Sequence, residues 1–222
     1  MFRRSEILLG NKINKLFSAN VIIFGIGGVG GYTAEMLVRS GIGSITIVDY
    51  DTVDISNKNR QIIALDSTIG KPKVEVMRDR IYDINKDCKV TIINDKITPE
   101  NIDKFNLVSY NYVIDAIDMV TSKVALIKFC KDNNIKIISA MGAGNRVDIP
   151  TFEVVDIYKT YNDGLAKILR SKLKKLDVKE HKVVFTTNIA TPNGDTIGSI
   201  SYYPAMCGCV LSAYVVQELI NN

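Results

Sequence analysis

Short apolar runs alternate with amphipathic stretches along the first 150 residues of the chain. The runs have the length and composition of buried strands. They lie at residues 21–24, 46–49, 90–93, 112–115 and 135–138. Between them, apolar residues recur at helical spacing, as in Val74, Met77, Ile81 and Ile84. Strands that alternate with helices through short connections form mostly parallel sheets covered by helices. The pattern predicts a Rossmann-like α/β fold.

A glycine-rich turn follows the first of these strands. Gly25, Gly27 and Gly30 have the spacing G-x-G-x-x-G, Gly28 lies between them, and a helix-forming segment comes next. In such a turn the first glycine permits the bend, the second lets a phosphate approach the backbone, and the third lets the helix pack closely. Asp49 ends the next strand at about the distance typical of a ribose-binding carboxylate. The pattern predicts a nucleotide site and leaves open which nucleotide binds.

The segment after the second strand is dense in polar side chains that bind nucleotides or metals. It contains Asp49, Asp51, Asn57, Arg60 and Gln61. A dehydrogenase needs one acidic residue here and none of the others. Polar loops at the carboxyl ends of parallel strands usually serve a ligand, although a solvated loop is the alternative.

Lys73 follows Pro72 at the predicted start of a helix. The helix macrodipole disfavours a cation at that position, and an anionic partner would offset the cost. A solvated surface lysine is the alternative interpretation, and the position alone does not decide between them.

Two carboxylates end the fourth strand. Asp115 and Asp118 stand three residues apart, on the side of the sheet where the glycine loop lies. Mg²⁺ prefers one or two carboxylates together with phosphate oxygens. The alternative is that Asp118 caps the helix that begins near Val120. A second glycine loop, residues 139–145, follows the fifth strand at the same edge.

The pattern changes beyond Pro150. Strands are expected at 151–156 and 183–186, an amphipathic helix at 165–176, and a last helix from about 205 to 220. Residues 1–19 predict an amphipathic helix packed on the sheet, and 191–195 predict a mobile polar turn. We expect one domain over 1–222, with a nucleotide-binding core at 1–150 and a C-terminal α+β extension at 151–222.

Composition and charge narrow the class of protein. No apolar run has the length of a membrane span, and the N-terminus lacks the apolar core of a signal peptide, so we expect a cytoplasmic protein. The four cysteines form no C-x-x-C pair, so we expect no zinc site and no disulfides. The net charge is +4, but residues 159–182 hold eight Lys or Arg against three acids. A basic helix face is usually only solvated; with a nucleic-acid substrate it is where phosphate contacts are expected.

With these residues placed, the chain resembles the ubiquitin-activating-type (ThiF-type) adenylating superfamily, and within it the tRNA threonylcarbamoyladenosine dehydratases. The resemblance covers nearly the whole chain. Six motifs carry it: Met1-Phe2-Arg3-Arg4 with Leu9-Gly10, residues 25–30, residues 49–61, Gly70-Lys71-Pro72-Lys73, Asp115-Ala116-Ile117-Asp118, and Met141-Gly142-Ala143-Gly144-Asn145. Enzymes that use NAD share only the glycine loop.

The resemblance implies a role for individual residues. ATP would lie on the glycine loop, with Asp49 at the ribose, and with Asn57, Arg60 and Lys73 at the phosphates. Asp118 would bind Mg²⁺, and Asp51 and Asp115 would border the nucleotide. Arg4 would reach the ATP of a second subunit, which implies a homodimer. Arg60, Lys73, Asp118 and Arg4 would therefore serve catalysis.

The resemblance also implies partners. The substrate would be tRNA carrying threonylcarbamoyladenosine, and a sulfur-acceptor or cysteine desulfurase protein is a further partner to consider; neither DNA nor a membrane is expected. The main alternative is an adenylyltransferase that activates the C-terminal glycine of a ubiquitin-like sulfur carrier. A non-catalytic nucleotide sensor or scaffold is a third class. Residues 162–167 and Asn188 depart from the dehydratase pattern, on the expected tRNA side.

Overall fold

The computed structural model describes residues 1–191, 194 and 196–221. Within these residues, seven strands form one sheet in the order β3-β2-β1-β4-β5-β7-β6. The strands are β1 Asn20–Phe24, β2 Ser44–Val48, β3 Lys89–Ile93, β4 Tyr112–Asp115, β5 Ile137–Ala140, β6 Phe152–Asp156 and β7 Lys182–Thr186. All neighbouring pairs are parallel except β6 with β7. The strand order reverses between β1 and β4, which is the switch point where open α/β sheets bind ligands.

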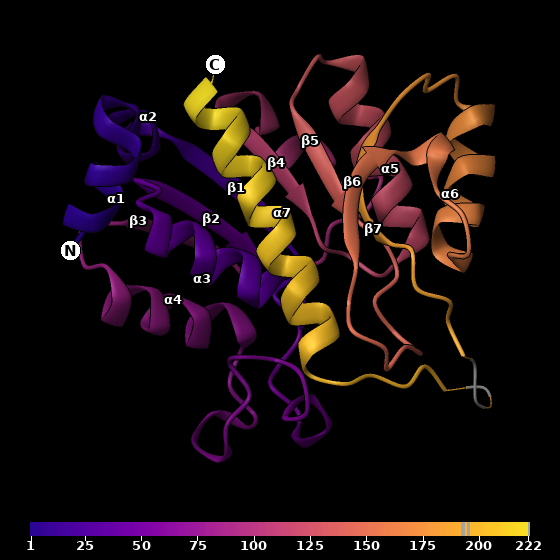
Figure 1. Ribbon diagram of the computed structural model, residues 1–222, viewed down its shortest axis with the longest axis horizontal. Helices are drawn as coiled ribbons and strands as arrows, with labels where there is room; N and C mark the ends of the chain where they lie inside the picture. The colour runs from indigo at the N-terminus through magenta and orange to yellow at the C-terminus, as the bar shows by residue number, and fades with distance from the viewer. Residues whose placement is uncertain (192–193, 195, 222) are drawn as a thin grey trace.

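Helices cover both faces of this sheet (Figure 1). Helices α3 (Gly30–Ser40), α4 (Lys73–Ile84) and α7 (Tyr202–Asn221) pack on one face, and α5 (Val120–Asp132) and α6 (Gly164–Lys175) on the other. Alternate residues of β1 enter the two cores: Val21 and Ile23 the first, Ile22 and Phe24 the second. Because both faces are covered, the central strands carry apolar residues on both faces, as the sequence pattern indicated.

The region beyond residue 150 continues the same sheet. Strand β7 pairs in parallel with β5, and β6 returns antiparallel along β7 to form one edge. The mostly parallel α/β fold predicted from the sequence is confirmed, and the predicted C-terminal strands complete its sheet. The polar turn expected at 191–195 falls largely outside the described residues.

The N-terminal segment differs from the single packed helix that was expected. It forms α1 (Arg3–Leu9), a short 3-10 turn (Gly10–Lys12) and α2 (Ile13–Ser18). Helix α2 buries Ile13 and Leu16, whereas α1 buries no residue. The prediction of packing was therefore right for α2 and wrong for α1, where Ile7 and Leu8 are 80% and 83% exposed.

Helix α7 is an apolar helix of the core. Among the described residues, it is long and apolar enough to cross a membrane by length and composition alone. Eight of its residues are buried, and it packs across α3 and the sheet (Figure 1). Its apolar composition fits this buried position in the core.

Candidate nucleotide site

The glycine loop between β1 and α3 is too tight for side chains at two of its positions. Gly25 has φ of +88°, and a Cβ there would lie 2.7 Å from the carbonyl oxygen of Ala116. A Cβ at Gly30 would lie 1.7 Å from the carbonyl oxygen of Gly25, because α3 starts directly against the end of β1. At Gly27 the nearest atom would be 3.7 Å away. The loop is therefore closed at its two ends and open at Gly27, where a phosphate would approach.

Backbone donors face the open part of this loop. Helix α3 has 11 residues and no side-chain cap at its N-terminus. In the part of the chain that the structure describes, the N–H groups of Gly27, Gly28 and Val29 have no protein acceptor. Free N–H groups at a helix N-terminus, together with the helix dipole, favour an anion. This geometry suits a phosphate group.

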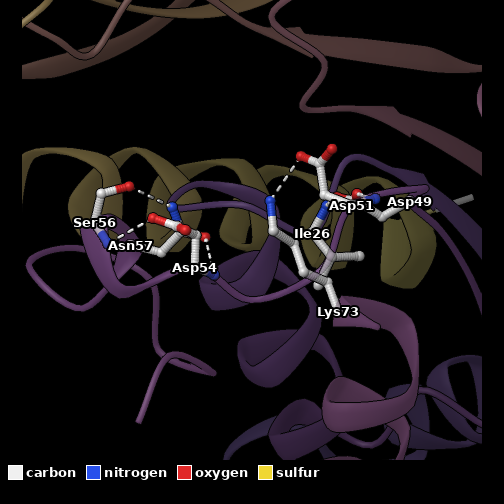
Figure 2. A network of polar contacts seen from close by, with 7 residues as sticks. All are labelled: Ile26, Asp49, Asp51, Asp54, Ser56, Asn57 and Lys73. Atoms are coloured by element: carbon white, nitrogen blue, oxygen red, sulfur yellow. Dashed lines mark hydrogen bonds and ion pairs between the residues drawn. The ribbon is translucent and has the colours of Figure 1, made fainter. Parts of the chain in front are cut away.

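Polar contacts connect the glycine loop to the segment after β2 (Figure 2). Asp49 Oδ2 accepts the N–H of Ile26 at 2.6 Å, and Asp49 Oδ1 accepts the N–H of Asp51 at 2.9 Å. Asp49 is buried, whereas the Asp51 side chain is 47% exposed. Each carboxylate oxygen of Asp49 has a second lone pair, so it can still accept a ribose hydroxyl.

Lys73 begins helix α4, as the sequence predicted. Its Nζ lies 2.9 Å from Asp51 Oδ2, and its side chain is only 7% exposed. Its backbone N–H also donates to the Asp51 carbonyl oxygen, so the two residues are joined twice. Asp51 is therefore an anionic partner that offsets the unfavourable helix dipole.

Asn57, Arg60 and Gln61 form the next part of the site. Asn57 is buried and accepts the N–H of Asp54, whose carboxylate accepts the N–H of Ser56 (Figure 2). Arg60 donates to the Ser56 carbonyl oxygen, and a Cβ at Gly28 would lie 3.5 Å from Arg60 Cγ. These contacts place the methylene carbons of the Arg60 side chain against the glycine loop.

Gln61 is a residue that sequence reasoning quoted but gave no role. It is buried, its Oε1 has no hydrogen-bond partner among the described residues, and its Nε2 lies near the open position of Gly27. A buried amide oxygen without a partner is costly. A bound ligand that donates a hydrogen bond would remove that cost.

The two carboxylates after β4 have different environments. Asp115 is fully buried; its Oδ2 lies 2.8 Å from Nζ of the fully buried Lys123, and its Oδ1 accepts the N–H of Ile117. Asp118 is exposed. Helix α5 has Met119 as its N-cap residue and no side-chain cap, so Asp118 does not cap it in this structure. Of the pair, Asp118 alone is accessible to a solvent-borne metal ion.

Negative charge gathers at this edge of the sheet. The pKa of Tyr50 is raised by the charge of Asp51, by burial, and by the charges of Asp118 and Asp49. All three carboxylates therefore act on the same phenol, and Asp51 is also paired with Lys73. A divalent cation would relieve their mutual repulsion.

Arg4 lies apart from the other predicted residues. The Phe2 and Phe17 rings are 5.3 Å apart, and Phe17 packs on Gly41, which follows the C-terminal end of α3. The glycine loop is at the other end of that helix. Eleven residues of helix correspond to about 16 Å. Helix α1, which carries Arg4, is thus outside the site of its own chain (Figure 1).

The cysteines offer no reactive thiol in the described structure. Burial raises the pKa of Cys130 and of Cys207 to about 12 and that of Cys88 to about 11, and it also raises the pKa of Cys209. All four are free thiols. Among the described residues no group of three or more His, Cys, Asp or Glu side chains has the arrangement of a metal site.

Comparison with known proteins agrees with this geometry. The profile of the ThiF family matches residues 5–222. The chain belongs to the ThiF family. This assignment covers both the nucleotide-binding half of the sheet and the strands β6 and β7, in keeping with a single continuous sheet.

The relatives of this chain include tRNA threonylcarbamoyladenosine dehydratases. A tRNA threonylcarbamoyladenosine dehydratase of Bacillus subtilis (strain 168) is 36% identical over 241 residues, covering 100% of this chain and 95% of the relative. The enzyme of the same name from Escherichia coli (strain K12) is 47% identical over 168 residues, covering 75% of this chain and 63% of the relative. A crystal structure of the E. coli dehydratase in complex with ATP has a TM-score of 0.93 at 37% identity, covering 99% of this chain and 93% of that one.

A second functional group within the family is less similar. The molybdopterin-synthase adenylyltransferase of E. coli (strain K12) is 30% identical over 149 residues, covering 67% of this chain and 57% of the relative. The similarity to the B. subtilis and E. coli dehydratases is thus both higher and more complete.

Proposed function

We propose that this protein catalyses the ATP-dependent dehydration of N6-threonylcarbamoyladenosine in tRNA, closing the threonylcarbamoyl group into a ring, and that it does so in the cytoplasm. One observation carries the proposal: the glycine loop, with its N–H groups that are unpaired in the described structure, lies at the carboxyl ends of the strands together with Lys73, Arg60 and an exposed Asp118. Full-length similarity to a dehydratase supports the choice of substrate.

ATP fits the charges of the site better than NAD does. The free N–H groups of the glycine loop suit one phosphate, and the cations of Lys73 and Arg60 suit the further phosphates of a triphosphate. Asp49 would accept the ribose hydroxyls. The unpartnered Oε1 of Gln61 gives the nucleotide one more acceptor.

Mg²⁺ would be held by Asp118 together with phosphate oxygens. Mg²⁺ commonly takes one or two protein carboxylates and fills its remaining positions with phosphate and water. When bound, the ion would supply positive charge to the phosphate oxygens. Asp115 would contribute indirectly, since its pairing with Lys123 fixes the end of β4 from which Asp118 projects.

The reaction balances as an activation followed by ring closure. The threonine carboxylate of the modified base attacks the α-phosphorus of ATP, and pyrophosphate leaves. The neighbouring carbamoyl group then attacks the activated carbonyl, loses a proton, and displaces AMP. The substrate loses the elements of one water, and ATP becomes AMP and pyrophosphate. Lys73 and Arg60 would stabilise the negative charge that develops on the phosphate oxygens.

The basic face of α6 is the proposed tRNA contact. Lys167, Lys172, Lys174 and Lys175 are all exposed on this helix. Arg170 differs, because its guanidinium donates to the carbonyl oxygen and the hydroxyl of Thr160. The four lysines would contact phosphates, so tRNA binding should weaken steeply with added salt.

A homodimer would complete the site, with Arg4 reaching the nucleotide of the partner subunit. Arg4 lies too far from the glycine loop of its own chain to act there. The same helix exposes Ile7 and Leu8, an apolar pair that a second subunit would cover. Two-fold symmetry would then give both sites the same shared residue.

The alternative is adenylation of the C-terminal glycine of a sulfur-carrier protein. It shares the ATP chemistry and differs in the acceptor. The chain has no C-x-x-C pair, which such relatives usually carry. A sulfur-acceptor or cysteine desulfurase protein would, in our proposal, be at most an accessory partner.

Pyrophosphate release tests the substrate class. Purified protein with Mg-ATP is mixed with threonylcarbamoylated tRNA, with unmodified tRNA, or with a ubiquitin-like carrier protein. We expect release only with the threonylcarbamoylated tRNA. Release with the carrier protein alone would favour the alternative, and tighter binding of NAD than of Mg-ATP in a calorimetric titration would contradict the nucleotide assignment.

A further inference from the structure

The second glycine loop, Gly142–Asn145, is held by a buried arginine that directly follows it. Arg146 is only 6% exposed. Its Nη1 donates to the carbonyl oxygens of Gly142 and Gly144 at 3.1 and 2.9 Å. A guanidinium carries five donors in a fixed planar arrangement, so it can hold several acceptors in one geometry.

The same guanidinium joins this loop to two other segments. Arg146 Nε donates to the Asn188 carbonyl oxygen at 2.9 Å, and Nη2 donates to the Asn162 carbonyl oxygen at 3.2 Å. Asn162 directly precedes the N-cap residue of α6, and Asn188 follows β7. One side chain thus links the loop after β5, the start of the basic helix, and the segment after β7.

Asp163 links two of these segments a second time. It is 5% exposed and is the N-cap residue of α6. Its Oδ1 accepts the N–H of Ala166 at 2.9 Å, and its Oδ2 accepts the N–H of Gly142 at 3.0 Å. A Cβ at Gly142 would lie 3.3 Å from Asp163 Oδ2, so a side chain there would press on the carboxylate.

The contacts close a ring around one residue, Gly142. Gly142 donates its N–H to Asp163 and accepts from Arg146 at its carbonyl oxygen, and Arg146 returns to Asn162 beside Asp163. Asn145 and Asn162 have φ of +57° and +51°, the left-handed region that non-glycine residues adopt at a cost. Such conformations persist where the surroundings fix them.

We infer that Arg146 and Asp163 are positioning residues that fix the Gly142–Asn145 loop relative to the N-terminus of α6. This inference rests on the proposed function, because it assigns the loop to the site of ring closure and α6 to the tRNA. The two side chains would hold the modified base, delivered by the tRNA, so that its threonine carboxylate faces the α-phosphate of ATP. Neither touches the glycine loop that holds the nucleotide, so ATP binding should not depend on them.

The test compares Arg146→Met, Arg146→Lys and Asp163→Asn with a matched control, Asp156→Asn. The Asp156 carboxylate also accepts two backbone N–H groups, those of Tyr158 and His181, but at the amino end of β7, away from the site. We expect the Arg146 and Asp163 variants to lose on the order of 10-fold to 100-fold in kcat with threonylcarbamoylated tRNA. Their Kd for Mg-ATP should stay within about twofold. Arg146→Lys should not restore activity, because a lysine lacks the planar fork.

Hydrogen exchange of the protein alone separates this inference from the proposed function. Arg146→Met and Asp163→Asn should each increase hydrogen exchange in both 142–146 and 160–167, and no substrate is needed for this effect. If Arg146→Met does not fold, Asp163→Asn alone carries the test. Equal loss of activity in Asp156→Asn, loss of Mg-ATP binding, or unchanged exchange in the two segments would overturn the inference. If wild-type protein leaves threonylcarbamoylated tRNA unchanged while the two segments still respond together, the proposed function fails and the coupling stands.

Discussion

Buried charges are the most consequential single residues in this protein. Lys123 and Asp115 are both fully buried and lie 2.8 Å apart at the end of β4. Removing one partner of a buried ion pair leaves an uncompensated charge in the core. The sequence shows Lys123 only as one more polar residue of a helix, so this pairing was not predicted.

We predict that Lys123→Met lowers the free energy of unfolding by about 3–5 kcal/mol. Lys128→Met is the control on the same helix, because Lys128 pairs with Asp132 at the surface and such pairs contribute about 1 kcal/mol or less. Urea denaturation at pH 7 measures both. Similar values for the two variants would contradict the importance given to the buried pair.

His181 is the single histidine of the chain and is fully buried. Its Nε2 lies 2.8 Å from the Ser139 hydroxyl oxygen. Burial, followed by the charges of Lys131 and Lys123, holds the pKa of His181 well below its ordinary value of 6.5. Below pH 6.5 the unfolded chain therefore binds a proton that the folded chain does not. The contribution of neutral His181 to the free energy of unfolding is therefore full above pH 6.5. It decreases as the pH falls toward the pKa of His181 in the folded state.

We predict that the free energy of unfolding of the wild-type protein falls from pH 6.5 to pH 5, by up to about 1.4 kcal/mol per pH unit. His181→Gln should show a flatter dependence over this range, because the ordinary pKa values of carboxylates lie lower. Urea midpoints at half-unit intervals give both curves. Parallel curves would show that the pH dependence has another origin.

At the scale of elements, two glycines of one loop should have different roles, Gly30 in folding and Gly27 in ligand binding. We predict that Gly30→Ala destabilises the protein by several degrees in Tm, because its Cβ would overlap the Gly25 carbonyl oxygen.

Gly27→Ala should stay within about 2 °C of the wild-type Tm, since its Cβ has room. It should still weaken Mg-ATP binding about tenfold or more by covering the free N–H groups. Thermal melts and calorimetry measure the two effects; normal Mg-ATP affinity in Gly27→Ala would exclude this loop as the phosphate site.

Local pattern was enough to predict the central elements. The run after Asn20, the turn at Gly25 and the helix begun by Lys73 obey rules that involve only near neighbours in sequence. Helix α1 was mispredicted because Ile7 and Leu8 are apolar yet have nothing to cover them within one chain. Sequence pattern does not distinguish a face buried in the core from one left exposed.

The site was predictable where its chemistry is local and unpredictable where it depends on tertiary contacts. Asp49, Asp51 and Lys73, which the resemblance places around one nucleotide, lie within one network of contacts. The burial of Asp115 depends on its ion pair with Lys123. The conformation of the second glycine loop depends on Arg146, one of whose acceptors, Asn188, is distant in sequence. Pairs this distant in sequence leave no periodic signal.

At the scale of the whole molecule, the proposed dimer predicts complementation. Arg4→Ala and Asp118→Asn should each be inactive alone. In an equal mixture, half the dimers are hybrids and one of their two sites keeps both residues, so about a quarter of the sites should be intact. Activity of the mixture after subunit exchange measures this. No recovery, with hybrid dimers confirmed by differential tagging, would contradict sharing of Arg4 between subunits.

The most direct measurement of the central claim is mass spectrometry of nucleosides from threonylcarbamoylated tRNA treated with the protein and Mg-ATP. We predict a product lighter than threonylcarbamoyladenosine by one water, together with AMP and pyrophosphate. Asp118→Ala protein, whose exposed substitution should leave the fold intact, should form none of it. Unchanged nucleoside, alongside ATP-dependent adenylation of a carrier protein's terminal glycine, would contradict the dehydratase account and establish the alternative.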